Sequence, residues 1–128
     1  LKGKIVISVI APLVFEKGIA HGLGVPEGSA AELTALMLPD SKVVSAFHNL
    51  SAHDLLDPNH EMTGDVVVCS EFEDAKHQVS DLINSIPSLR SIDGGSLANS
   101  RYVENLTALL ININRRYGAR TSIQFLGI

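Results

Sequence analysis

Six side chains that could bind a divalent metal ion lie close together between residues 48 and 61. Neutral imidazoles and carboxylates are common ligands for Zn²⁺ and related ions, but Pro58 interrupts any long helix here and surface loops are often rich in such residues. This segment is either a metal site built on the loop around His53 or a solvated loop that binds no metal. We favour the loop without a metal. The six residues are His48, His53, Asp54, Asp57, His60 and Glu61.

Two glycine-rich segments are candidates for phosphate binding. The first, residues 22–28, has the spacing G-x-G-x-x-x-G and contains Pro26, which removes an amide donor, so it lacks the dinucleotide fingerprint. The second, Asp93-Gly94-Gly95-Ser96, leads from a predicted strand to a helix N-terminus, whose free amides could hold an anion. We expect the first to be an ordinary loop and Ser96 in the second to cap the helix.

The sequence offers little for nucleophilic catalysis. Cys69 is the only cysteine; it ends a predicted buried strand with no nearby histidine, so we interpret it as a small core residue. The serines form no G-x-S-x-G turn. A single cysteine also excludes an internal disulfide and indicates a reducing, cytoplasmic location.

Composition narrows the class of protein further. The chain has 128 residues, is 45% hydrophobic and carries a net charge of -4, which suits one folded domain and disfavours nucleic acid and anionic membranes as partners. The longest apolar run, residues 5–15, is far shorter than the ~20 residues that span a bilayer and has no cleavage site of a signal peptide.

The elements that must position these residues can be predicted from hydrophobic patterns. Continuous apolar runs predict strands covered on both faces, and apolar residues at helical spacing predict helices between them. The capping box Ser29-Ala30-Ala31-Glu32 predicts a helix that ends before Pro39. This order predicts an α/β fold with a mostly parallel sheet, joined by two long loops, residues 12–28 and 49–64. The predicted strands are residues 5–11, 43–47, 66–69, 89–92 and 122–125, and the further helices are residues 75–86 and 96–117.

The last predicted helix has apolar residues on most of its circumference, so we expect it to be largely buried. Its asparagines then need partners, because a buried unsatisfied amide costs ~1 to 3 kcal/mol. Neighbouring backbone, a cofactor or another subunit could supply them. The basic residues near its end predict a solvated helix terminus, with an acidic ligand as the alternative. The asparagines are Asn99, Asn105, Asn112 and Asn114, and the basic residues are Arg115, Arg116 and Arg120.

Seven short segments, spread over nearly the whole chain, occur here in one characteristic order. They are Lys4–Ser8, Pro26–Leu33, Lys42–His48, Asp65–Cys69, Leu89–Gly95, Leu97–Arg101 and Ile123–Leu126. In this order they resemble the F420-dependent NADP reductases. One departure is Ser70-Glu71, where the family more often has glycine followed by acidic residues.

The resemblance implies the later strands of a Rossmann-like, mostly parallel sheet with a small C-terminal α/β extension. Residues 1–50 would form the later Rossmann-type strands and a cofactor-facing loop. Residues 51–128 would form the C-terminal region for F420 binding and homodimerisation, within one compact unit. The family's first strand and NADP-binding glycine turn have no counterpart here, and because the sequence begins with Leu1 instead of methionine we expect a preceding nucleotide-binding half.

The resemblance also implies an activity, hydride transfer between NADP(H) and coenzyme F420. Such a reaction needs the protein to position the two cofactor rings and to exclude water, so we expect no catalytic acid or base. By resemblance, Ala11, Pro12 and Leu13 would bound the nicotinamide, while His48, Asn49 and Leu50 would hold the deazaflavin. Thr121 would close the same pocket or contribute to a dimer interface.

Two other interpretations stay open. Without the resemblance, His48 would be read as a strand-end histidine with satisfied hydrogen bonds. For the whole chain, the alternative to an enzyme is a non-catalytic α/β module for dimerisation or regulation.

Overall fold

The computed structural model describes all residues, 1–128. Its core is a four-stranded sheet in the order β1-β4-β5-β6, with a separate two-stranded hairpin of β2 and β3. The fold is α/β with a mixed, mostly parallel sheet, because β1 pairs with β4 and β5 with β6 in parallel, whereas β4 and β5 are antiparallel. The elements are β1 (Ile5–Ser8), β2 (Leu13–Glu16), β3 (Ile19–Gly22), α1 (Ala30–Met37), β4 (Lys42–Ser45), α2 (Ala52–Leu56), β5 (Gly64–Ser70), α3 (Glu73–Asn84), β6 (Leu89–Gly95), a 3-10 turn (Leu97–Asn99) and α4 (Ser100–Tyr117).

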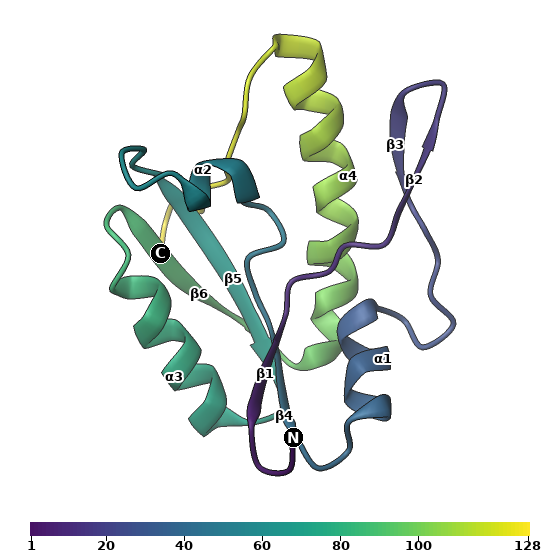
Figure 1. The fold of residues 1–128 in the computed structure, drawn as a ribbon, viewed down its shortest axis with the longest axis vertical. Helices are drawn as coiled ribbons and strands as arrows, with labels where there is room; N and C mark the ends of the chain where they lie inside the picture. Colours follow the sequence, from purple (N-terminus) through teal and green to yellow (C-terminus); the bar gives the residue numbers. More distant parts are fainter.

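Helices cover both faces of the sheet (Figure 1). On one face α3 packs its apolar stripe against strand residues such as Val44 and Val66. On the other face α1 and the start of the last helical segment enclose Val43, which points away from Val44 because successive strand side chains alternate. The predicted helix start at Ser29 is confirmed, and the predicted apolar stripe of α3 is confirmed except at Leu82, which is 50% exposed. Ser29 Oγ accepts a hydrogen bond from the Glu32 amide at 3.1 Å and donates to the Glu32 carboxylate at 2.7 Å.

The pairing of β4 with β5 corrects the predicted crossover. Residues 46–63, which join these strands, contain α2 as their one helix and do not run back along the sheet. The chain therefore enters β5 at the end of the sheet where β4 finishes. As a result the carboxyl ends of β1 and β4 lie at one end of the sheet, and those of β5 and β6 lie toward the other.

One predicted loop and one predicted strand were wrong. Residues 12–28 contain the hairpin of β2 and β3, whose turn residues Lys17 and Gly18 have φ of 52° and 79°. Positive φ at both central residues matches the twist of a tight hairpin, and glycine makes it accessible. Residues 122–125 form no strand, because they share only one backbone hydrogen bond with β5, from the Asp65 amide to the Ile123 carbonyl at 2.8 Å.

The last helix also differs from its prediction. It ends at Gly118 in the left-handed conformation, with φ of 60°, as expected. It is not largely buried, since Tyr102 is 68% and Leu109 55% exposed. Only one face of α4 packs against the rest of the chain, so the apolar residues on the other face remain at the surface. No helix of the structure is both long and apolar enough to cross a bilayer.

Ser96 does not cap the helical segment that follows it, contrary to the prediction. The Leu97 amide instead donates to the carboxylate of Glu71 at 3.0 Å. The carboxylate thus takes the position that an external anion would occupy at this helix N-terminus. The segment Asp93–Ser96 is therefore not a phosphate site in this fold.

Candidate functional site

A groove of about 300 Å³ lies where the chain leaves β4 and passes α4. It is bounded by three segments distant in sequence, the loop after β4, one face of α4 and the tail that follows α4. Figure 1 shows where these three segments run in the fold. Because β1 and β4 end at this side of the sheet, the groove has the usual position of a ligand site in an α/β fold. Its lining residues are His48, Asn49, Leu50, Ser51, Thr107, Leu110, Ile111, Asn114, Arg120 and Thr121.

The helical wall of the groove is a single stripe of α4. Thr107, Leu110, Ile111 and Asn114 are three or four residues apart, so they lie on one face of the helix. The two middle residues are apolar, and Asn114 fixes the tail: its Oδ1 accepts hydrogen bonds from the amide and the hydroxyl of Thr121, at 2.8 and 2.5 Å. The stripe thus provides an apolar floor with polar groups at both ends.

His48 is the most unusual side chain of this site. The residue is 6% exposed, and both ring nitrogens are buried without a hydrogen-bond partner. Burial lowers the pKa of the imidazole from 6.5 to about 4, so the ring is neutral at pH 7. A buried polar group without a partner is uncommon in native proteins and costs free energy until a partner arrives.

The protein itself supplies no partner for the ring, and two hollows adjoin this residue. One is a small cavity lined by residues such as Phe47, Val66 and Val103, and it has about 0 Å³ of space for a water molecule. A water molecule needs room and several polar partners. The other is the groove, which is large enough to accept a molecule with polar groups.

The backbone around His48 is tied to α4. Thr107 Oγ1 donates to the His48 carbonyl at 3.0 Å and accepts a hydrogen bond from Asn49 Nδ2 at 3.1 Å. Asn49 Nδ2 also donates to the Val103 carbonyl at 3.2 Å. These three bonds fix the loop against the helix across 54 to 59 residues of sequence.

An ion pair closes the rim of the groove. Arg120 contacts the carboxylate of Asp54 with Nη2 at 2.9 Å and Nε at 3.1 Å. Asp54 is buried in α2, whereas the side chain of Arg120 is 53% exposed. The pair joins the tail to α2 beside the loop that carries His48. Arg120 is therefore more than a solvated helix end, and its neighbour Arg115 also bonds inside the fold, to the Gly18 carbonyl.

The structure brings part of the predicted site together. His48, Asn49, Leu50 and Thr121 all line the groove, although Thr121 is more than 70 residues away in sequence. Residues 11–13 do not line it. Pro12 lies at the base of the hairpin, where its carbonyl accepts a hydrogen bond from the Leu23 amide at 3.0 Å.

Other groove residues were not singled out from the sequence. Ser51, Thr107, Leu110 and Ile111 belong to this set. The spacing of the last three predicts a shared helix face, but nothing in the sequence distinguishes a groove wall from an ordinary packing face.

Three of the four asparagines of the last helical segment find hydrogen-bond partners within the chain, and the fourth, Asn105, is exposed. Asn112 bonds both the amide and the carbonyl of Ala20 in β3, at 2.8 and 2.9 Å. Asn99 donates to the Gly94 carbonyl at 2.8 Å. Of the three partners left open by the sequence, neighbouring backbone is thus the one that Asn99, Asn112 and Asn114 use.

The loop around His53 does not form a metal site. No three His, Cys, Asp or Glu side chains anywhere in the chain are grouped closely enough to hold a metal ion, and in this loop His60 Nε2 lies 3.7 Å from Asp54 Oδ2. The loop does border a larger cavity of about 480 Å³. Its one buried carboxylate, Asp54, is already paired with Arg120, so this larger cavity presents no unpartnered buried polar group. The smaller groove at His48 is therefore the better candidate site.

Cys69 is fully buried. Burial raises the pKa of its thiol, which keeps the sulfur in the unreactive protonated form. Its interpretation as a small core residue is confirmed.

Comparison with known proteins gives one consistent relationship. No family model matches the chain. The chain is 43% identical to the F420-dependent NADP reductase of Methanocaldococcus jannaschii over 122 residues, which is 94% of this chain and 55% of that protein. It is 37% identical to the F420-dependent NADP reductase of Methanothermobacter marburgensis, covering 89% of this chain and 53% of that protein. A more distant similarity, 32% identity over 87% of this chain, is to 21% of the rat metalloreductase STEAP3.

Among solved structures, a putative F420-dependent NADP reductase from Arthrobacter superposes with a TM-score of 0.84 and 25% identity. The match covers 100% of this chain and 59% of that one. The chain thus spans a little over half the length of the reductases that it matches. By sequence and by fold, the chain is a relative of the F420-dependent NADP reductases.

Proposed function

We propose that this chain provides the F420-binding wall of an enzyme that transfers a hydride between NADP(H) and coenzyme F420. The observation that carries the proposal is the groove at His48, whose neutral, buried imidazole has no hydrogen-bond partner within the protein. The names of the relatives supply the chemical class of the ligand. The groove supplies a place for it.

The size of the groove fits one flat ring system. Ligand pockets usually measure about 300–1,000 Å³, and a groove of about 300 Å³ stands at the lower end of that range. One cofactor ring fills it, and a second cofactor must lie outside. Because the chain lacks a dinucleotide fingerprint, the NADP side of the reaction is assigned to a nucleotide-binding half joined to this chain.

The lining has the chemistry that a flat heterocycle with polar edges needs. Leu50, Leu110 and Ile111 offer an apolar surface for its face and exclude water. A neutral histidine carries one donor and one acceptor nitrogen, so His48 can bond to a ring carbonyl or a ring N–H. F420, when bound, supplies the ring carbon that accepts or gives the hydride; the protein fixes its position and needs no proton transfer of its own.

The remaining proposed contacts to the cofactors lie at the end of the sheet where β1 and β4 finish. Ala46 donates a hydrogen bond to the Ser8 carbonyl at 3.1 Å, so the chain leaving β1 begins beside the chain leaving β4. By resemblance to the family, Ala11, Pro12 and Leu13 then bound the nicotinamide next to the deazaflavin. Thr121, held by Asn114, closes the end of the groove.

The test is a titration of F420 with the chain, followed by the absorbance of the deazaflavin. We expect saturable binding that His48→Ala weakens about tenfold, the effect of losing roughly 1.4 kcal/mol of hydrogen bonding. His77→Ala is the matched control, because His77 is exposed on α3, on the opposite face of the sheet. Unchanged affinity of the His48 variant contradicts the proposal.

The same titration with NADPH added tests the assignment of the two halves. We expect no bleaching of the deazaflavin by the chain alone, and turnover when a nucleotide-binding half is joined to it. Turnover by the chain alone would show that the second half is dispensable.

A second candidate function is a non-catalytic dimerisation or regulatory module in the cytoplasm. It is favoured by the apolar residues that α4 leaves at the surface, with Tyr102, Leu109 and Tyr117 all more than half exposed. An enzyme of the proposed kind can also be a homodimer, so the oligomeric state alone does not separate the two. A dimer by light scattering that binds no F420 supports the module, whereas F420 binding at His48 supports the enzyme.

A further inference from the structure

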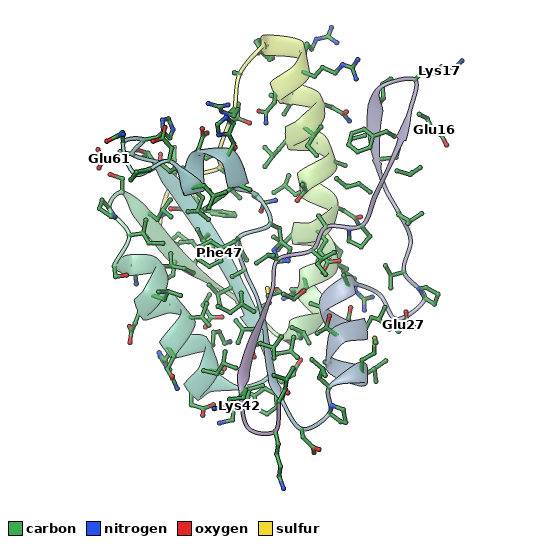
Figure 2. The ribbon with its side chains drawn as sticks, in the orientation of Figure 1. Glu16, Lys17, Glu27, Lys42, Phe47 and Glu61 are labelled. Atoms are coloured by element: carbon green, nitrogen blue, oxygen red, sulfur yellow. The ribbon has the colours of Figure 1, made fainter.

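The backbone just before His48 has an unusual conformation. Phe47 has φ of 68°, in the left-handed region that bulky residues rarely adopt. Such strain persists only where surrounding contacts over-determine the conformation, and it is concentrated at ligand sites. Figure 2 shows Phe47 in the middle of the molecule, where it packs against the core cluster that includes Val44 and Val66.

The backbone just after His48 is held from the other side of the sheet. The hydroxyl of Thr107 in α4 donates a hydrogen bond to the His48 carbonyl at 3.0 Å. The same hydroxyl accepts a hydrogen bond from the side-chain Nδ2 of Asn49 at 3.1 Å. His48 is therefore fixed between a side chain in the core on the α3 face and a hydroxyl on the α4 face.

We propose that Thr107 and Phe47 are positioning residues, which fix the backbone of His48 so that its imidazole stays buried beside the groove, with both nitrogens unpaired until a ligand reaches them. This inference rests on the proposed function for the identity of the ligand. The juxtaposition itself, of a strained backbone, a buried unpartnered ring and a bridging hydroxyl, is independent of that identity. Thr107 acts through His48, and we expect its own contact with the ligand to be weaker than that of His48.

A double-mutant cycle on F420 affinity tests the coupling. Thr107→Val has nearly the same shape but lacks the hydroxyl, and we expect it to weaken F420 binding about tenfold. Thr107→Ser retains the hydroxyl and is the matched control, expected to bind within about twofold of the original chain. In a His48→Ala background, Thr107→Val should cause no further loss. A tenfold loss in that background as well would overturn the inference, because Thr107 would then act on the ligand directly.

A second measurement separates this inference from the proposed function, since it requires no ligand. NMR titration of the His48 ring reports its pKa, which burial holds at about 4. Thr107→Val should raise this pKa toward 6.5 as the freed ring gains contact with water, and Thr107→Ser should not. An unchanged pKa in the valine variant refutes the positioning role.

The other anchor is tested in the same way by Phe47→Leu, which keeps an apolar side chain in the core. This variant should raise the pKa of His48 while the chain stays folded, and an unchanged pKa would refute the role of Phe47. If the original chain fails to bind F420 while these pKa values change as expected, the proposed ligand is wrong and the positioning role stands.

Discussion

Replacement of His48 by glutamine should remove a defined part of the acid sensitivity of this fold. The imidazole is buried at the end of β4, and its pKa falls from 6.5 to about 4 because the charged form is poorly solvated there. In the unfolded chain the same ring is hydrated and takes up a proton near pH 6.5. As the pH decreases, the unfolded state therefore binds the proton first, and the folded state is destabilised relative to it.

The size of the effect follows from the two pKa values. Each unit of difference corresponds to about 1.4 kcal/mol, so the full effect is roughly 3.4 kcal/mol, complete below about pH 4. At pH 4.5 the loss relative to pH 7 is about 2.5 kcal/mol, and above pH 6.5 it disappears. Glutamine does not titrate, so this share of the pH dependence should be absent from the His48→Gln variant.

The assay is urea unfolding of both proteins at pH 7 and pH 4.5. Other groups titrate in the same range, including Glu104, whose pKa burial raises, but they are common to the two proteins and cancel in the comparison. We expect the original chain to lose about 2.5 kcal/mol more stability than the variant over this interval. An equal loss in the two proteins would refute the reasoning that the ring is buried, neutral and without a partner.

Two further predictions concern the segments that enclose the site. Asn112→Ala should remove both hydrogen bonds to Ala20, destabilise the hairpin of β2 and β3 by about 1–3 kcal/mol and speed amide exchange there. Asp65→Asn should loosen the tail, because the buried carboxylate accepts hydrogen bonds from Arg90 at 2.7 and 2.9 Å and from the Phe125 amide at 2.6 Å. We expect the free energy of unfolding, measured in urea at pH 7, to fall by about 2 kcal/mol. Because the hydrogen bond from Arg90 holds the pKa of Asp65 below its usual 3.8, this contribution is present above that pH and is lost as the pH falls below it.

Local signals in the sequence predicted much of the fold. The helix start at Ser29, the stripe on α3 apart from Leu82 and the glycine after α4 each depend on residues within one or two turns, and each is confirmed. The antiparallel step from β4 to β5 depends on the path that residues 46–63 take in the folded chain, and the hydrophobic pattern contains no such information. The Lys17-Gly18 turn is a weaker hairpin signal than Asn-Gly, so the hairpin was not distinguished from a loop.

The site shows the same division between local and distant information. His48, Asn49 and Leu50 follow a buried strand, so their position at the end of the sheet could be inferred from the sequence. Three other contacts join residues that are 26 to 66 positions apart in the sequence. They are the bond from Thr107 to the His48 carbonyl, the pair of Arg120 with Asp54, and the bond from the Leu97 amide to Glu71. Such contacts arise only when the chain is folded, and no spacing rule predicts them.

Mapping F420 onto the chain by amide chemical shifts tests the central claim most directly. We expect F420 to shift the amides of residues 48–51, of the α4 stripe from Thr107 to Asn114 and of Thr121, while the loop around His53 and the α3 face change little. Shifts confined to the larger cavity beside α2, or no shifts at saturating F420, would contradict it.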